Sequence, residues 1–282
     1  MRDIRLATLP ARLSRRPDDC NKGDFGSVAI LGGAPGMAGA PLLAARAALM
    51  CGAGRVYVGM LDERVGLDPN TPELMVTHPA ALSSLPRPAC MVAGPGLGSS
   101  AAARAALLAI LNMEHPLLLD ADALNLLAAD PAMREQVRAR TAPTVLTPHP
   151  GEAGRLLGMS GAEIQRDRLG GVLRLCEDFH AVAVLKGAGT LVKAPGTDVW
   201  RNGSGNPGMA APGMGDVLTG IIAALIAQGM TTADAAVVGV WLHGAAADLA
   251  VDEGLGPCGL TASELSPRAR GLLNTQLIGT DS

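Results

Sequence analysis

Residues 27–60 read SVAILGGAPGMAGAPLLAARAALMCGAGRVYVGM. An apolar run that ends in two glycines predicts a buried strand over Ser27–Gly33. Alanine and leucine then dominate Ala38–Met50, which predicts a helix, and the apolar run of Arg55–Met60 predicts a second strand. A strand, a helix and a strand in this order favour two parallel strands joined by a right-handed crossover.

The same alternation of strand and helix runs along the rest of the chain. We predict helices over Ala101–Leu111, from about Ala123, and from the capping-box residues Ser160 to Glu163 toward Asp178. Further strands are predicted at 91–93, 117–119, 144–146, 181–185, 189–193 and 198–201. This order implies a three-layer α/β/α fold with a mostly parallel central sheet and helices on both faces. The sequence shows no linker or repeat, so we expect a single domain over residues 1–282, with residues 1–20 as a candidate flexible segment.

Composition excludes several classes of protein. The net charge of −3 and the lack of a long Lys/Arg run give no reason to expect nucleic acid as a partner. Five scattered cysteines without a CxxC pair indicate reduced residues, most of them packing residues, in a cytoplasmic protein. No apolar stretch is expected to span a membrane, because Ala235–Val251 is interrupted by His243 and Asp248. The apolar surroundings of His243 predict a packed core residue.

The stretch from Asn206 to Gly220 reads NPGMAAPGMGDVLTG. Apolar residues then recur at helical spacing, so a helix is predicted to begin near Gly213 to Gly215, with its free N–H groups directed into the glycine loop. Such a helix start favours phosphate or developing negative charge. Asp216 at this position is best explained as a base beside a reacting phosphoryl group. An Asp that only satisfies N–H groups is the structural alternative, but four glycines over residues 205–215 favour a site.

Other turns follow predicted strands and should meet at the carboxyl edge of the sheet, where such folds bind ligands. The loops Gly32–Ala40 and Gly94–Gly98 are each either ligand-binding loops or plain tight turns. In the sequence Asp120-Ala-Asp-Ala-Leu-Asn125, Asp120 is a candidate to hold Mg²⁺ through water beside phosphates. Asp122 either does the same or caps the following helix.

Two further turns carry charged side chains. In Thr147-Pro-His-Pro-Gly-Glu152, two prolines hold His149 rigidly, which favours a ligand contact. Glu152 is either a cation partner or a helix-start carboxylate. The turn Lys186-Gly-Ala-Gly-Thr190 places an ammonium beside backbone that a phosphate can approach, and a hairpin with a solvated lysine is the alternative.

Taken together, these motifs resemble the ADP-dependent NAD(P)H-hydrate dehydratase family, a branch of the ribokinase-like superfamily. The resemblance covers about residues 20–250 and begins at Lys22-Gly-Asp-Phe-Gly-Ser-Val28. The Gly-Asp turn at Asp216 indicates only the superfamily. His149-Pro-Gly-Glu152 and Gly205-Asn-Pro-Gly-Met209 narrow the resemblance to this family.

The resemblance implies a hydro-lyase of nicotinamide nucleotide repair, with Asp216 as the base. Such an enzyme removes water from the S epimer of hydrated NADH or NADPH at the expense of its co-substrate ADP, giving AMP and phosphate. Mg²⁺ is the implied cofactor and a homotetramer the implied assembly. The implied nucleotide contacts are Lys186, Gly187, Ala188, Gly189, Thr190, Gly213 and Gly215. The implied contacts of the hydrated substrate are Ala40, Gly96, Gly98, His149 and Asp216. Further site candidates are Asp120, Asn125, Glu152 and Asn206, and no metal ligand is assigned.

The chain departs from the family pattern at two places. Ala211-Pro212 stands where many relatives have Thr-Gly, so a hydroxyl is missing, and proline has no N–H to donate. An anion hole is therefore expected to begin at Gly213. The residues before Lys22 are too few for the epimerase domain that bacterial relatives often carry, so we expect a separate epimerase chain. The alternative functions are an ATP-dependent kinase of a vitamin-type alcohol in the same superfamily and a non-catalytic nucleotide sensor.

Overall fold

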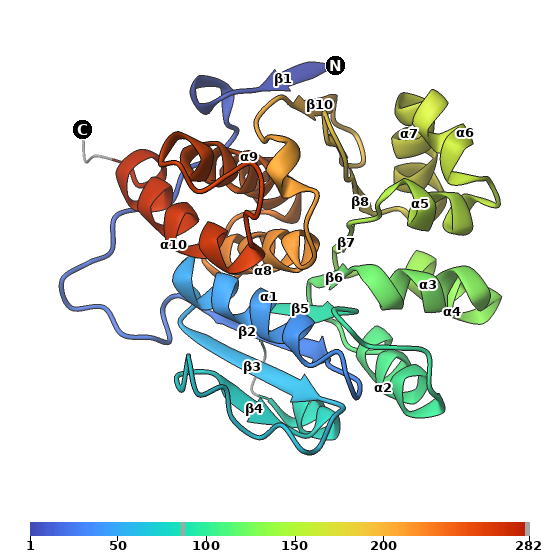
Figure 1. Ribbon diagram of the computed structural model, residues 1–282. Helices are drawn as coiled ribbons and strands as arrows, with labels where there is room; N and C mark the ends of the chain where they lie inside the picture. The colour runs from blue at the N-terminus through green and yellow to red at the C-terminus, as the bar shows by residue number, and fades with distance from the viewer. Residues whose placement is uncertain (86–87, 280–282) are drawn as a thin grey trace.

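A computed structural model of the protein describes residues 1–85 and 88–279. In this part of the chain, ten strands form one sheet in the order β1-β10-β9-β8-β7-β6-β5-β2-β3-β4 (Figure 1). The strands are β1 (Arg2–Ile4), β2 (Ser27–Gly32), β3 (Arg55–Met60), β4 (Met75–Thr77), β5 (Cys90–Ala93), β6 (Leu117–Leu119), β7 (Thr144–Leu146), β8 (Val182–Leu185), β9 (Leu191–Lys193) and β10 (Val199–Asn202). Strands β1 and β4 are additional to those that the sequence predicts.

The sheet is mostly parallel, as predicted. Strands β8, β7, β6, β5, β2, β3 and β4 each lie parallel to the next. Strand β9 is antiparallel to both β8 and β10, so among the described strands it alone runs against the others. The turns that follow β2, β5, β6, β7 and β8 therefore lie on one edge of the sheet, its carboxyl edge.

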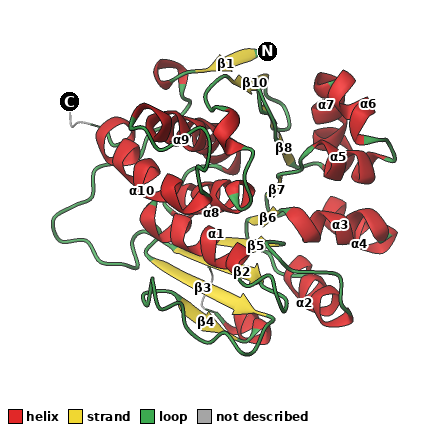
Figure 2. Ribbon diagram, viewed as in Figure 1, coloured by secondary structure: helices red, strands yellow, loops and turns green. Residues whose placement is uncertain are grey.

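Helices cover both faces of this sheet, which confirms the three-layer α/β/α fold. One layer holds α1, α8, α9 and α10, and the other holds α2 to α7 (Figures 1 and 2). The helices are α1 (Gly39–Met50), α2 (Ala101–Leu111), α3 (Ala121–Ala129), α4 (Pro131–Ala139), α5 (Pro150–Leu157), α6 (Gly161–Arg166), α7 (Arg168–Phe179), α8 (Met214–Ala227), α9 (Thr232–Asp252) and α10 (Ala262–Leu272). Short helical turns lie at Leu6–Thr8, Pro79–Ser84, Pro207–Met209 and Leu273–Leu277.

The strands divide their side chains between two hydrophobic cores. On β2, Val28 and Ile30 join the core beneath α1, α8, α9 and α10, whereas Ala29 and Leu31 join the core beneath α2 to α7. Successive side chains of a strand point to opposite faces, so a strand buried on both faces reads as a continuous apolar run. The apolar runs that predict these strands arise from this burial.

Helix α8 packs closely on α1, and this contact sets the position of its N-terminus. A Cβ atom at Gly220 would lie 2.0 Å from the carbonyl oxygen of Ala44, a distance that only glycine permits. Apart from the small Ala and Gly residues at the contact, α8 buries Val217, Leu218 and Ile221. The apolar spacing of the helix thus holds its first turn at the carboxyl edge of the sheet.

Two helix boundaries differ from prediction. Helix α3 begins at Ala121, because Asp120 takes the N-cap position with extended backbone. The helix predicted from Ser160 toward Asp178 is two helices, α6 and α7. Asp167 separates them, since its side chain accepts a hydrogen bond from the N–H of Gly170 at 2.8 Å and starts α7.

Helix α9 corrects the reason given for expecting no membrane span, because His243 and Asp248 do not interrupt its apolar character enough. By length and composition, Thr232–Asp252 is apolar enough to cross a membrane. However, 72% of its most apolar window is buried inside the protein, where α9 packs against α8 and α10. His243 lies in this helix and is only 6% exposed, which confirms its predicted burial. The apolar character of α9 follows from its place in the core.

The two ends of the described chain are attached to the fold. Strand β1 pairs in parallel with β10 through residues 2–4 and 200–202. Farther along, Leu13 forms a parallel bridge with Ile278. The candidate flexible segment, residues 1–20, therefore contains a strand of the sheet. The five cysteines are free thiols, as predicted, and burial raises the pKa of Cys51 and Cys90 to about 12.

Candidate active site

An ion pair joins two of the turns at the carboxyl edge. Lys186, which follows β8, donates from Nζ to Oδ1 of Asp120, which follows β6, at 2.6 Å. The other oxygen of Asp120 accepts from the Thr219 hydroxyl of α8 at 2.9 Å. Burial disfavours the charge of Lys186, but the neighbouring carboxylates outweigh burial and raise its pKa. The lysine is an ammonium, and it ties the ends of two strands to α8.

The alternative for Lys186, a hairpin with a solvated lysine, is correct for the hairpin and wrong for the lysine. Strands β8 and β9 do pair as an antiparallel hairpin around residues 186–190. The lysine at its base is not solvated, because its side chain is only 18% exposed. Its Nζ also lies 3.9 Å from Oε2 of Glu152. The hairpin therefore presents its glycines while Lys186 points into the protein.

His149 and Glu152 form a capping box at the start of α5. The N–H of His149 donates to Oε2 of Glu152 at 2.7 Å, and His149 Nδ1 accepts from the N–H of Gly151 at 2.9 Å. The helix-start reading of Glu152 is thus confirmed, and burial raises its pKa. Burial also lowers the pKa of His149, so its ring is neutral. Because Nδ1 accepts, the ring proton resides on Nε2, which can donate to a ligand or to Glu152.

Asp216 lies in the first turn of α8, as predicted. Helix α8 begins at Met214, and its N-cap residue Gly213 has a φ of 85°, which favours glycine. Burial, and after it the nearby negative charge of Asp120, together raise the pKa of Asp216 to about 7, although the positive charge of Lys186 opposes them. At neutral pH Asp216 is thus divided between its protonated and its unprotonated form, as a general base requires.

Gly215 brings this helix start against the ion pair. A Cβ atom at Gly215 would lie 3.2 Å from Lys186 Nζ and 3.7 Å from Asp120 Oδ2. The Lys186 ammonium therefore lies beside the free N–H groups of the first turn of α8. The ammonium and the N–H groups both favour an anion at this place. Pro212 precedes the N-cap, which agrees with an anion site that begins at Gly213.

The two glycine loops of the first strands lie against each other. The N–H of Ala34 donates to the carbonyl of Gly96 at 2.7 Å, and a Cβ atom at Gly96 would lie 3.2 Å from the Cβ of Ala40. Gly98 donates from its N–H to Oδ2 of Asp122 at 2.8 Å. Asp122 therefore does not cap α3 but fixes the loop of residues 94–98. The predicted substrate contacts Ala40, Gly96 and Gly98 are thus brought together.

A cavity of about 820 Å³ opens beside the ion pair. Its walls come from the β8–β9 hairpin, the loop after β10 and one face each of α8 and α9. Among the predicted site residues, it is lined by His149, Lys186, Gly187, Ala188, Gly189, Thr190, Asn206 and Gly215. All the predicted nucleotide contacts except Gly213 thus line one cavity that is large enough for a nucleotide, and the predicted base Asp216 is not among its lining residues.

The loop of residues 203–211 in this cavity is held from α9. Asp248 accepts from the N–H of Gly205 at 2.8 Å and from the side-chain amide of Asn206 at 3.1 Å. Asn206 Oδ1 in turn accepts from the N–H of Gly208 at 3.0 Å. Asn206 shapes this loop. It does not contact the ion-pair cluster, which consists of Lys186, Asp120, Thr219 and Glu152. Asn125 is also outside it, and its amide donates to Oδ1 of Asp122 at 3.3 Å.

Three residues of the site were not predicted. They are Thr219 of α8, which donates to Asp120, Asp248 of α9, which accepts from Gly205, and His243 of α9, which lines the cavity. The sequence does carry a signal for two of them, because His243 and Asp248 are polar residues inside an otherwise apolar helix. A polar group that interrupts a buried face commonly has a specific partner.

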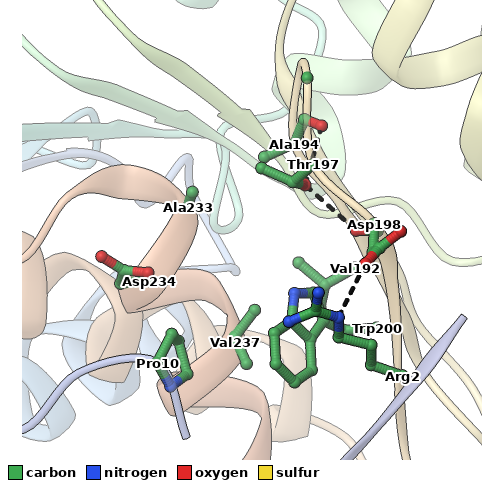
Figure 3. Close-up of a pocket in the computed structure, with 11 residues that line it drawn as sticks. Arg2, Pro10, Val192, Ala194, Thr197, Asp198, Trp200, Ala233, Asp234 and Val237 are labelled. Carbon is green, nitrogen blue, oxygen red and sulfur yellow. Dashed lines mark hydrogen bonds and ion pairs between the residues drawn. The ribbon is translucent and has the colours of Figure 1, made fainter.

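A second cavity of about 450 Å³ lies near the N-terminal strand, between β9, β10, β1 and the start of α9 (Figure 3). Here Nε of Arg2 donates to Asp198 at 2.7 Å, and its guanidinium lies 5.5 Å from the Trp200 ring centroid. The charged groups of Arg2 and Asp198 satisfy each other. This cavity holds none of the predicted site residues, so the cavity beside Lys186 is the better candidate active site.

The carboxylates of the site fit a Mg²⁺ ion that is bound mainly through substrate phosphates and water. In residues 1–85 and 88–279, no group of three His, Cys, Asp or Glu side chains is placed to hold a metal ion. Both oxygens of Asp120 already accept hydrogen bonds, from Lys186 and Thr219. Mg²⁺ commonly keeps several waters and binds through substrate phosphates with few protein ligands. The site therefore suits an ion that arrives with phosphates and not an all-protein metal centre.

Comparison with known proteins agrees with this geometry. A family model described as NAD(P)H-hydrate dehydratase matches residues 28–268. The chain is 43% identical over 270 residues to an ADP-dependent (S)-NAD(P)H-hydrate dehydratase of Neisseria meningitidis, with 94% of this chain and 91% of that protein covered. It is 46% identical over 268 residues to a bifunctional NAD(P)H-hydrate repair enzyme of Coxiella burnetii, covering 93% of this chain. It spans only 53% of that longer protein.

A solved structure supports the same assignment. The crystal structure of an ADP/ATP-dependent NAD(P)H-hydrate dehydratase of Bacillus subtilis, co-crystallised with ATP and Mg²⁺, superposes with a TM-score of 0.84 at 29% sequence identity. The match covers 97% of this chain and 98% of that one. From the family model, the sequence identities and this superposition, the chain belongs to the NAD(P)H-hydrate dehydratase family.

Proposed function

We propose that this protein removes water from the (6S) hydrate of NADH or NADPH at the expense of ADP, releasing AMP and phosphate. The observation that carries the proposal is Asp216, a carboxylate with a pKa of about 7 in the first turn of α8, in the electrostatic field of Lys186 and Asp120. A base that titrates near neutral pH beside an anion site suits the phosphorylation of a hydroxyl group. The family of the chain supports the same activity over the kinase alternative.

The proposed chemistry turns a poor leaving group into a good one. Asp216 takes the proton of the ring hydroxyl while the hydroxyl oxygen attacks the β-phosphorus of ADP. The bond from that phosphorus to the bridging oxygen breaks, and AMP leaves. Elimination of phosphate together with a ring proton then restores the dihydropyridine. ADP and the hydrate are consumed one for one.

The surrounding residues stabilise the charge that develops in this step. The free N–H groups from Gly213 onward would donate to the transferring phosphoryl oxygens, and the Lys186 ammonium lies beside the same region. The hairpin of residues 187–190 would hold the AMP portion. His149, neutral and protonated on Nε2, would orient the hydrated substrate together with the loops at Ala40 and Gly96–Gly98.

Mg²⁺ is proposed as the ion that accompanies the ADP phosphates. It would neutralise phosphate oxygens, held chiefly by those oxygens and water. Asp120 is the protein carboxylate at hand, but its two hydrogen bonds make it foremost the partner of Lys186. The residues of the chain supply the base and the orienting contacts.

A direct assay tests the proposal. The protein is incubated with hydrated NADH and either ADP or ATP, while the absorbance of reduced nicotinamide is followed. We expect recovery of absorbance with release of AMP when ADP is supplied. No recovery with either nucleotide, together with a stable phosphoester on an added alcohol, would instead indicate a kinase. Tight nucleotide binding without phosphate release would indicate a sensor.

The pH dependence follows from the pKa of Asp216. The base acts only when unprotonated, so kcat/KM should rise with pH through a midpoint near 7 and then level off. Asp120→Asn removes a negative charge that raises this pKa, so the midpoint should move to lower pH. The measurement is a pH series of kcat/KM for both proteins. An unmoved midpoint would contradict the assignment.

The contact from α9 should control nucleotide binding. Asp248→Asn replaces an oxygen that accepts from Gly205 or Asn206 by an amide that cannot accept. We expect KM for ADP to rise about fivefold, as for the loss of roughly 1 kcal/mol of hydrogen bonding, with kcat nearly unchanged. Asp252→Asn, which removes the same charge from the exposed end of α9, is the matched control. An equal effect of both variants would disprove the role of Asp248.

Four further proposals rest on the resemblance and the relatives. The first is that the chain forms a single domain. The second is that it assembles as a homotetramer, and the third is that it works in the cytoplasm. The fourth is that a separate epimerase supplies its substrate epimer. The chain spans about half the length of the bifunctional relatives that it matches. Light scattering tests the tetramer, and addition of an epimerase to a mixture of hydrate epimers tests the partner. With the epimerase, dehydration should run to completion.

A further inference from the structure

A buried histidine beside the nucleotide cavity is not used by the proposed reaction. His243 lies in the middle of α9, is 6% exposed, and borders the cavity beside Lys186. Within residues 1–85 and 88–279, its Nε2 atom has no hydrogen-bond partner. Buried polar atoms almost always have a partner, so an exception in the wall of a binding cavity requires an explanation.

The protonation state of this ring is clear from its surroundings. Burial, followed by the positive charge of Lys186, lowers the pKa of His243 to about 4, so the ring is neutral at physiological pH. A hydrogen bond with the backbone of Met214 favours a proton on the ring. A neutral imidazole has one N–H and one lone pair. With the N–H directed to the backbone of Met214, the unpartnered Nε2 carries the lone pair and can only accept.

The lining of the cavity beside Lys186 contains apolar side chains as well as His243. Val240 lies one turn before His243 on α9, and Met214, Leu218 and Met209 also line the cavity with apolar side chains. Lys186 and the backbone of the hairpin line the same cavity, and the positive charge of Lys186 favours phosphates there. An apolar wall with one hydrogen-bond acceptor suits a flat nucleobase that carries an amino group.

We propose that Nε2 of His243 accepts a hydrogen bond from the exocyclic amino group of adenine when ADP binds. This inference rests on the proposed function only in taking ADP as the nucleotide. His243 would then be a specificity residue, because a purine without the amino group leaves the acceptor unpartnered. A 6-oxo purine would place a second acceptor against it. The enzyme would select adenine nucleotides through a residue of α9 and not through the hairpin alone.

The test is a cycle of binding measurements without the hydrated substrate. The ligands are ADP and purine riboside 5′-diphosphate, which differs from ADP only in lacking the amino group. The proteins are wild type, His243→Phe, which removes the acceptor, and His243→Gln, which places an amide oxygen near the position of Nε2. We expect wild type to bind ADP about tenfold more tightly than purine riboside diphosphate, as for the loss of one partner of a buried hydrogen bond.

The variants separate recognition from packing. His243→Phe should weaken ADP binding about tenfold and leave the affinity for purine riboside diphosphate unchanged, and His243→Gln should restore most of the affinity for ADP. An equal loss for both ligands, or no loss for either, would overturn the proposal. If His243→Phe does not fold, equal affinities of the wild type for the two ligands would also overturn it. Absence of hydrate turnover by the wild type would refute the proposed function but not the adenine contact.

Discussion

Replacing Asp216 by asparagine should reduce kcat roughly 10³-fold while ADP binding is retained. The expected size is that of a lost general base. Asparagine keeps the shape of the side chain at the start of α8 but cannot accept a proton. It also removes a negative charge from an anion site, so the affinity for ADP should stay equal or improve. The measurement is steady-state turnover of the hydrate together with calorimetry of ADP binding.

A first-turn aspartate on the neighbouring helix is the control for this variant. Asp234 occupies the first turn of α9 and accepts from the hydroxyl of Thr231 at 2.8 Å, away from the ion-pair cluster. Asp234→Asn should leave kcat within about twofold of wild type. Near-normal turnover of a folded, ADP-binding Asp216→Asn protein would eliminate Asp216 as the base.

Replacing Lys186 by methionine should lower the free energy of unfolding by about 3 kcal/mol, the cost of leaving one buried partner of an ion pair alone. Asp120 is 1% exposed and would lose its 2.6 Å partner, while Glu152 and Asp216 lose a nearby positive charge. The pKa of Asp216 should rise, because Lys186 lowers it. Chemical denaturation measures the stability, and the pH profile of any residual activity measures the pKa.

A double variant distinguishes loss of the charge from loss of packing. In Asp120→Asn with Lys186→Met, no unpaired carboxylate remains at residue 120. The double variant should therefore recover part of the stability that Lys186→Met alone loses. If the single variant unfolds with the same free energy as wild type, the ion pair has no structural role.

The fold could be predicted because its signals are local. Strands β2, β3, β5, β6, β7 and β8 are buried on both faces and appear as apolar runs bounded by glycine, proline or aspartate. The start of α8 was also predicted within a residue, since Gly213 and the apolar spacing after it lie in one short stretch. Strand β1 has only three residues at the sheet edge and lacks such a run.

The contacts that assemble the site could not be predicted in the same way. Lys186 and Asp120 are 66 residues apart, and Asp248 reaches a loop 43 residues earlier in the chain. Each residue alone is an ordinary polar side chain, and only the strand order brings them together. Asp122 illustrates the limit, because its partner Gly98 lies on a different turn. Its sequence position leaves two roles open, a partner of Mg²⁺ and a helix cap, and indicates neither Gly98 nor its loop.

The fate of the hydroxyl oxygen tests the central claim most directly. Hydrated NADH labelled with ¹⁸O in the ring hydroxyl is incubated with the protein and unlabelled ADP, and the phosphate released is examined by mass spectrometry. If the hydroxyl, deprotonated by Asp216, attacks the β-phosphorus, each phosphate released should carry the label. Label that appears in water, with unlabelled phosphate, would show that ADP is hydrolysed separately and would contradict the mechanism.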